Sequence, residues 1–126
     1  MFLYITLGTN DLKRARRFYD AVMPTIGQAR RDGTESEISY GPAGDDRTRL
    51  WITLPFDNHP ATVGNGSMPA FDAASRSAVD GFYQAALRHG GTDEGAPGLR
   101  YSANFYSCYV RDPDGNKLSA VCDKPE

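Results

Sequence analysis

The amino-acid sequence predicts an α+β fold made of two βαβββ modules related by pseudo-twofold symmetry. A strand leads directly into an amphipathic helix near the N-terminus, the same unit recurs in the second half of the chain, and three short strand-like segments follow each copy. Two copies of so long a unit are too few for a solenoid. We therefore expect one domain over residues 1–126, with modules 1–55 and 67–122.

The first module opens with a strand and a helix. Alternating polar and apolar residues predict a strand over 4–7, with Tyr4 and Thr6 on one face. The other face, expected to pack against the helices, carries Leu3, Ile5 and Leu7. Asp11 suits the start of a helix, because its side chain can accept a free backbone N–H, and Pro24 suits the end. Between them the apolar residues recur at three- and four-residue steps, as one helix face requires; they are Leu12, Ala15, Phe18, Tyr19, Val22 and Met23.

Three further strands complete the first module, and they are predicted over residues 28–31, 35–40 and 49–55. The last of them alternates cleanly, which places Trp51 and Thr53 on the face away from the helices. Residues 56–66 are rich in Gly, Pro and Asn, so we interpret them as a connector between the modules.

The second module repeats the first at a constant offset. Phe82 matches Phe18, and the same offset aligns Met68 with Tyr4. The predicted elements are a strand over 68–73, a helix after Ser75, and strands over 92–94, 105–111 and 117–122. An Asp-Gly pair within residues 112–116 predicts the turn before the last strand. In that strand the face away from the helices carries Lys117, Ser119 and Val121.

Composition restricts the classes of partner and compartment. The net charge of −2 does not favour a nucleic acid or an anionic membrane as partner. No apolar run approaches the length of a membrane span, and Met1 leads straight into the first strand without room for a signal peptide. These features favour a cytoplasmic protein. Cys108 and Cys122 make no disulfide framework, and we expect both to be free thiols.

A curved mixed sheet covered by helices on one face leaves its other face free to act as a cup for a ligand. The candidate ligand-binding residues are those expected on or beside this open face: Tyr4, Thr6, Trp51, Thr53, Met68, Tyr101, Phe105, Lys117 and Ser119. For Trp51, a place in the core or in a dimer interface is as consistent with the pattern as stacking on a ligand. Lys117 and Ser119 could bind a carboxylate or phosphate, or Lys117 could simply be solvated.

The opening ITLGTNDLKRARRFYDAV and the closing YVRDPDGNKLSAVC resemble the vicinal-oxygen-chelate superfamily. That group includes glyoxalase I, fosfomycin and bleomycin resistance proteins and extradiol dioxygenases. In its metal-using members, the resemblance implies a divalent ion held by a histidine on the first strand of each module and a glutamate on the last strand. The corresponding positions here are Tyr4, Met68 and Ser119.

These three side chains offer a phenol, a thioether and an alcohol, which are poor ligands for the ions that such sites hold. Neither histidine replaces them, since His59 lies in the connector and His89 at the end of a helix. We therefore expect no cofactor and no divalent metal.

Two functions from different classes remain open at this point. The first is a metal-independent protein that binds a small organic molecule in the cup. The second is a glyoxalase-like lyase or isomerase, with Tyr4 as a hydrogen-bond donor or general acid or with a divalent ion that the sequence does not reveal. A weaker alternative is a structural dimer whose side chains fill its own cup. The resemblance and the frequency of twofold oligomers also predict a homodimer.

Overall fold

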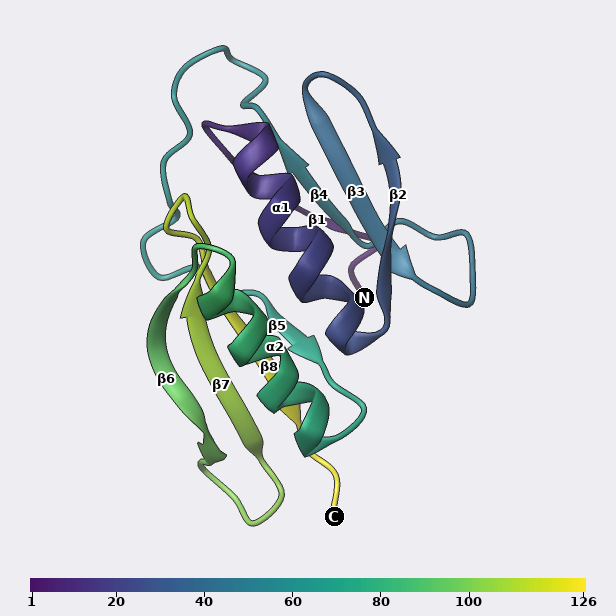
Figure 1. Ribbon diagram of the computed structural model, residues 1–126, viewed down its shortest axis with the longest axis vertical. Helices are drawn as coiled ribbons and strands as arrows, with labels where there is room; N and C mark the ends of the chain where they lie inside the picture. Colours follow the sequence, from purple (N-terminus) through teal and green to yellow (C-terminus); the bar gives the residue numbers. More distant parts are fainter.

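The computed structural model describes residues 1–126 as two helices and eight strands (Figure 1). The first module contains β1 (Ile5–Gly8), α1 (Leu12–Val22), the short 3₁₀ helix η1 (Met23–Ile26), β2 (Gln28–Gly33), β3 (Glu37–Pro42) and β4 (Leu50–Thr53). The second contains β5 (Ala70–Asp72), α2 (Arg76–Arg88), β6 (Thr92–Leu99), β7 (Tyr106–Arg111) and β8 (Lys117–Cys122). The predicted α+β class and the two βαβββ modules are confirmed.

The strands form two four-stranded mixed sheets with equivalent topology. Their strand orders are β1-β4-β3-β2 and β5-β8-β7-β6, and in each sheet only the outer first strand runs parallel to its neighbour. Leu7 lies opposite Ile52 in one sheet, as Phe71 lies opposite Ala120 in the other. The repeat seen in the sequence is therefore a repeat of backbone pairing. No hydrogen-bonded ladder joins β1 to β5, so the curved surface is built from two sheets instead of one.

Both helices begin on the side-chain caps that the repeat implies. The Asp11 carboxylate accepts from the backbone N–H of Arg14 at 3.0 Å, and the Ser75 hydroxyl accepts from that of Ala78 at 3.1 Å. Gly27 ends η1 with φ at 78°, a left-handed conformation that glycine adopts without penalty. Neither helix is long and apolar enough to cross a membrane.

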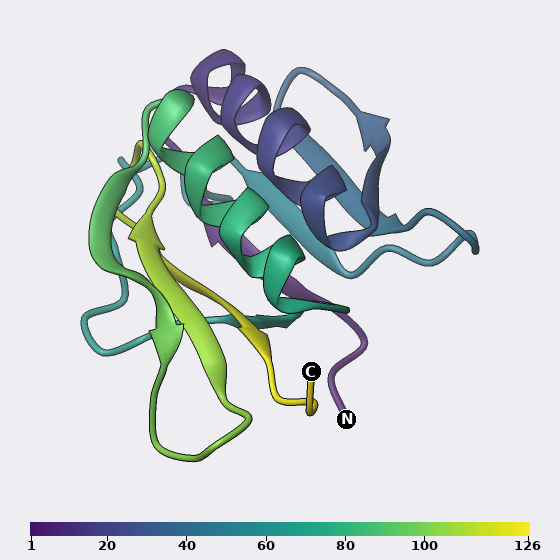
Figure 2. The ribbon, with the colours of Figure 1, turned by 60° about the horizontal axis from the view of Figure 1, so that its bottom comes forward.

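The helices lie side by side and cover one face of both sheets (Figure 2). One hydrophobic core, drawn from both modules, fills the space between the layers, and Phe18 and Phe82 are fully buried in it. Cys108 and Cys122 are buried free cysteines in the same core. The prediction that Leu3 packs against the helices is wrong, since its side chain is 65% exposed. Leu3 precedes β1, which starts only at Ile5.

The strand predicted over 92–94 is longer than expected, because β6 continues to Leu99 along β7. Its pairing shifts register around Gly95 and Gly98. Such irregularities are β-bulges, which break the alternation that identifies a strand in sequence.

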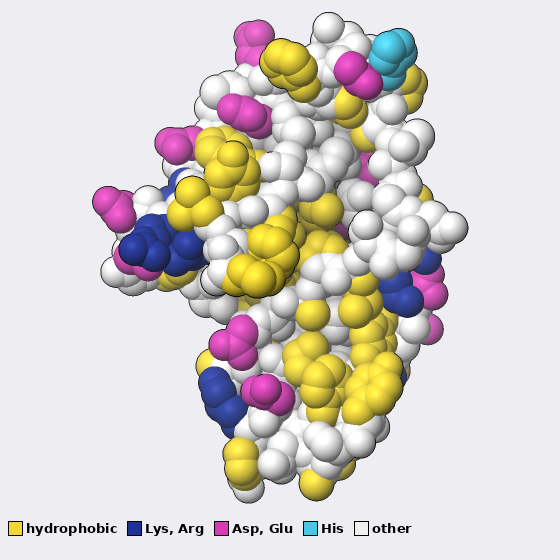
Figure 3. All heavy atoms as spheres, turned by 180° about the vertical axis from the view of Figure 1, so that it is seen from behind, with side chains coloured by type: hydrophobic (Ala, Val, Ile, Leu, Met, Phe, Trp, Pro, Cys, Tyr) yellow, Lys and Arg dark blue, Asp and Glu magenta, His cyan; other side chains and the backbone are white.

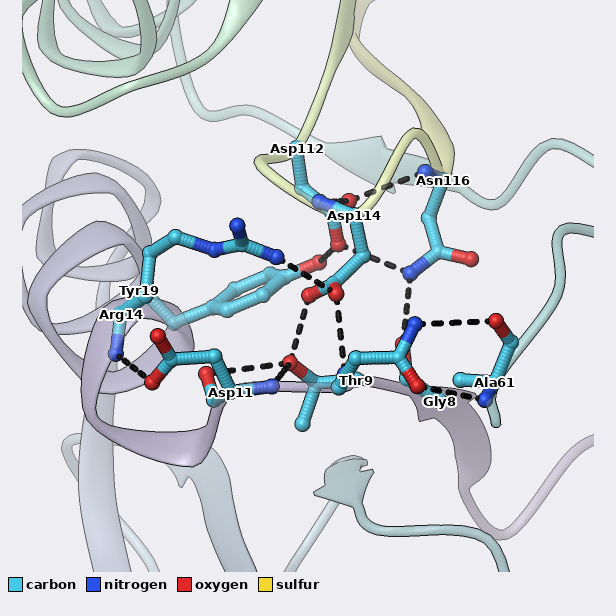
Figure 4. A network of polar contacts seen from close by, with 10 residues as sticks. Gly8, Thr9, Asp11, Arg14, Tyr19, Ala61, Asp112, Asp114 and Asn116 are labelled. Atoms are coloured by element: carbon cyan, nitrogen blue, oxygen red, sulfur yellow. Dashed lines mark hydrogen bonds and ion pairs between the residues drawn. The ribbon is translucent and has the colours of Figure 1, made fainter. Parts of the chain in front are cut away.

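The turn between β7 and β8 joins the second module to the first (Figure 4). The carboxylate of Asp114 accepts from the Thr9 hydroxyl at 2.5 Å, the Asn10 N–H at 2.9 Å and the Arg14 guanidinium at 2.8 Å. The Asn116 amide donates to the Gly8 carbonyl at 2.9 Å. We call the contacts of residues 112–116 with the first module the turn clamp.

Asp112 is the buried centre of the turn clamp. Its two oxygens accept from the Tyr19 hydroxyl at 2.5 Å, from the Asn116 side chain and backbone at 2.9 Å, and from the Asp114 N–H at 2.9 Å. Burial raises the pKa of Asp112 above its ordinary value, while the hydrogen bonds from Tyr19 and Asn116 act to lower it. The folded protein therefore bears a buried carboxylate that four donors stabilise.

Replacing Tyr19 with Phe removes the one side-chain donor to Asp112 that comes from the first module. We expect Tyr19→Phe to lower the free energy of unfolding at pH 7 by about 1.5–3 kcal/mol, the usual worth of a hydrogen bond to a charged group. The pKa of Asp112 should rise further. A carboxyl whose pKa is higher in the folded state costs stability as pH rises through the interval between its unfolded and folded values. The difference in the free energy of unfolding between wild type and variant should thus become smaller toward pH 4. Urea unfolding across pH 4–8 measures this difference.

Tyr83→Phe is the matched control, because the Tyr83 hydroxyl donates to Asp93 at 2.9 Å in an exposed pair within the second module. We expect it to change stability by less than about 0.5 kcal/mol at any pH. Equal losses in the two variants would contradict the importance of the turn clamp.

Candidate functional site

The face opposite the helices carries exposed apolar side chains around a hollow near its middle (Figure 3). Phe2, Tyr4 and Met68 are 73%, 50% and 38% exposed there, although each is mostly apolar. A cluster of large exposed apolar groups is unusual for a surface that only contacts water. The open face is therefore the candidate functional surface.

Two grooves run along the seam where β1 and β5 approach without pairing. The first, called the seam groove, has a volume of about 610 Å³. The second, called the Lys117 groove, has a volume of about 540 Å³. They share the side chains of Phe2, Ile5, Met68 and Pro69. Both volumes lie in the range of small-molecule sites.

The seam groove is mostly apolar and extends down toward the helix layer. Met23 and Ile26 of η1 line it, together with Tyr4, which directly precedes β1, and Phe71 of β5. Its charged lining residues are Arg49, Asp72 and Lys124. The Arg49 guanidinium donates a hydrogen bond to the Leu3 carbonyl at 3.1 Å, and this bond holds the N-terminal segment at the groove.

The Lys117 groove is more polar. Its lining combines apolar groups of β1 with the hydroxyls of Thr6, Thr62 and Ser67, and it ends at Asn116 and Lys117. Asn116 donates to Gly8 and Asp112, so this end of the groove is built by the turn clamp. A molecule bound here would meet hydrogen-bond donors on one side and apolar surface on the other.

Of the nine predicted ligand-binding residues, four line the grooves: Tyr4, Thr6, Met68 and Lys117. Trp51 lies on the same face, opposite Thr6 in the β1–β4 ladder, and is half-buried. Thr53 ends β4 and its hydroxyl donates to the Leu54 carbonyl at 2.8 Å.

Tyr101 and Phe105 lie apart from both grooves. Their rings pack edge to face at 5.3 Å in the loop between β6 and β7, and Tyr101 is 89% exposed with φ at 65°. They lie outside the lining of both grooves, because that loop is at the outer side of the second sheet.

Alternation along β8 places Ser119 on the open face, opposite the core residues Leu118 and Ala120. In the structure Ser119 is nevertheless fully buried. Its N–H donates to the Pro69 carbonyl at 3.0 Å, and it lies opposite Ala70 and Tyr109 on the neighbouring strands. Its hydroxyl has no hydrogen-bond partner. Such an orphaned buried hydroxyl requires an explanation, because burial without a partner is unfavourable.

Sequence reasoning missed several lining residues. Phe2 precedes the predicted strand, and Val63 and Ser67 belong to the segment interpreted only as connector and its edge. The one available signal was Val63, an apolar residue in a polar loop that has to cross the seam between the modules.

Comparison with known proteins assigns the family. A model of the Glyoxalase/Bleomycin resistance protein/Dioxygenase superfamily matches residues 2–119, so the chain belongs to that superfamily. A glyoxalase/bleomycin resistance protein from Albidiferax ferrireducens T118 is 39% identical, with a TM-score of 0.86 over 96% of this chain and 97% of that one.

More distant structures share the fold. A lactoylglutathione lyase from Agrobacterium tumefaciens is 19% identical, with a TM-score of 0.64 over 96% of this chain and 92% of that one. A fosfomycin resistance protein from Listeria monocytogenes is 18% identical, with a TM-score of 0.66 over 100% and 93%. No curated protein matches the chain. The resemblance noted in the sequence is therefore confirmed at the level of superfamily and fold.

The side chains at the three expected ligand positions do not fit a divalent ion. Tyr4 and Met68 meet at the seam groove, and β8 brings Ser119 beside Pro69, so the positions surround the seam. They present a phenol, a thioether and an alcohol. No group of three or more His, Cys, Asp or Glu side chains is placed to hold a metal ion.

We predict that the purified protein retains well under one divalent ion per chain after dialysis. The reason is that a stable site needs imidazole, thiolate or carboxylate ligands converging at about 2.0–2.2 Å. Elemental analysis measures the ion content, and a chelator should leave the melting temperature unchanged. Tyr4→His, Met68→His and Ser119→Glu combined should create an ion site. Stoichiometric zinc, nickel, manganese or iron in the unmodified protein would contradict the prediction.

Proposed function

We propose that this protein binds a small organic molecule in the grooves at the seam of its two modules, without a metal. The observation that carries the proposal is the pair of grooves of about 610 and 540 Å³ on an exposed apolar face. A concave surface that combines apolar side chains with a few polar groups is the usual form of a small-molecule site. Met68 belongs to both grooves, so one ligand could contact both.

The chemistry of the lining supports binding rather than hydrolysis or acyl transfer. Neither groove contains a cysteine or histidine. His59 lies in a separate shallow cavity with Asn58 and Pro60, and Cys108 is buried in the core with its pKa raised by burial to about 11. The grooves therefore contain no nucleophile paired with a histidine.

A lyase or isomerase activity is the second candidate, since one structurally similar protein is a lactoylglutathione lyase. Tyr4 is the groove residue that could donate a hydrogen bond or a proton in such a reaction. That likeness extends to the fold alone at 19% identity, so we favour binding.

Filling the shared part of the grooves should abolish binding. We expect fragments that bind the wild-type protein, detected by ligand-observed NMR, to lose their signals with Met68→Trp. A chelator should not change the wild-type binding. The reason is that Met68 lines both grooves, so a larger ring at this position occupies the space of a ligand.

Leu87→Trp is the matched control, because Leu87 is 40% exposed on α2, away from the grooves. It should leave fragment binding unchanged. Binding that survives in Met68→Trp, or that requires an added divalent ion, would contradict the proposal. Conversion of a bound fragment into a new product would favour the enzyme instead.

We also propose that the protein is a homodimer. The N-terminal segment supports this, because Met1, Phe2 and Leu3 are large, apolar and 65–111% exposed. Light scattering at micromolar concentration should show a dimer, and Leu3→Glu should shift it toward monomer because the charge opposes burial. Leu87→Glu, on the helical face, should not. A wild-type monomer under these conditions would refute the proposal.

A further inference from the structure

Lys117 is the only charged side chain that lines the Lys117 groove. None of the six ion pairs in the protein includes it. Its cross-strand neighbour Arg111 is already paired with Glu94. The ammonium of Lys117 is thus an uncompensated positive charge, in a chain whose net charge is −2.

The position of Lys117 leaves its hydrogen-bonding capacity free. The ammonium lies 5.6 Å from the centre of the Tyr109 ring, a cation–π contact that occupies no N–H donor. Arg100 also lies over Tyr109, at 5.0 Å, but its guanidinium donates to the backbone carbonyls of Gly98, Ala96 and Ser107. Of the two cations on this ring, only Lys117 makes no hydrogen bond within the protein.

Ser119 is the neighbouring polar residue on the same strand. It lies two residues after Lys117, so both side chains point to the same face of β8. Its hydroxyl is fully buried and has no partner. Ser119 lines neither groove, so the residues that can contact a ligand are Lys117 and the lining hydroxyls.

Three residues with hydroxyl groups line the same groove as Lys117. The side chains of Thr6, Thr62 and Ser67 line the groove, and none of them makes a hydrogen bond within the protein. No acidic side chain lines the groove. The adjoining carboxylates of Asp112 and Asp114 are held within the turn clamp by their own donors. The groove thus combines hydroxyl groups and one positive charge with apolar side chains.

We infer that the Lys117 groove binds a small molecule with one oxyanion group, a carboxylate, phosphate or sulfonate, attached to an apolar body. Lys117 holds the anion, with the hydroxyls of the groove lining as further donors. The body lies along Ile5 and Met68 toward the seam groove. This inference rests on the proposed binding function and names its ligand class.

Two fluorescent dyes test the anion separately from the apolar body. 8-Anilinonaphthalene-1-sulfonate carries a sulfonate, and N-phenyl-1-naphthylamine has the same rings without it. We expect the wild-type protein to bind the sulfonate dye more tightly. Lys117→Met should weaken that binding about tenfold or more, as loss of a charge-assisted contact implies, and should leave the neutral dye unchanged. Lys117→Arg should retain most of the preference.

Lys13→Met serves as the charge-matched control, because Lys13 is exposed on α1. It should change the affinity of neither dye, and thermal melting checks that every variant is folded. If both dyes bind but Lys117→Met weakens neither, the anion site is refuted and the proposed binding function stands. If neither dye binds the wild-type protein, the proposed function fails and this inference fails with it.

Discussion

The turn clamp is the contact on which the arrangement of the two modules depends. β1 and β5 share no hydrogen bonds, so the sheets need other connections. The helix layer supplies apolar contact, which has little directional preference. The Asp112 and Asp114 carboxylates supply direction, because they accept from donors at the end of β1, on α1 and in the turn itself. A shift of one module would leave buried carboxylates without partners, which is costly.

The grooves exist because the turn clamp connects the two modules at one end of the seam only. Asn116 ties the turn to Gly8, where β1 ends, and also lines the Lys117 groove. Farther along, β1 and β5 separate, and Met68 and Ile5 line the space between them. A continuous sheet would have closed this space with backbone hydrogen bonds. The unpaired seam thus converts a pseudo-symmetric fold into a binding surface.

The two modules share a backbone but differ in the chemistry that they present to the open face. Thr6 and Trp51 face each other across β1 and β4, where the second module has Ala70 and Ser119. The second module alone carries the Arg100, Tyr109 and Lys117 cluster. The asymmetry gives the surface one cationic end, although the backbone pairing is repeated. The same fold occurs in a fosfomycin resistance protein and a lactoylglutathione lyase, so the fold by itself does not define a function.

By itself, the sequence determined the features that depend on neighbours along the chain. Alternation predicted that Ile52 and Ala120 are buried, and helical spacing predicted the burial of Phe18 and Phe82, since both periods are local properties of the backbone. The family resemblance put Tyr4 and Met68 at the positions of metal ligands in the cup, and in the structure both line the seam groove. Leu3 was misplaced because strand alternation was extended beyond the point where β1 pairs. Only the tertiary structure decided that Tyr19 reaches Asp112, that Val63 and Ser67 line a groove, and that Ser119 is buried without a partner. These contacts join residues far apart in the chain, and their geometry follows from how the modules pack, which no local pattern records.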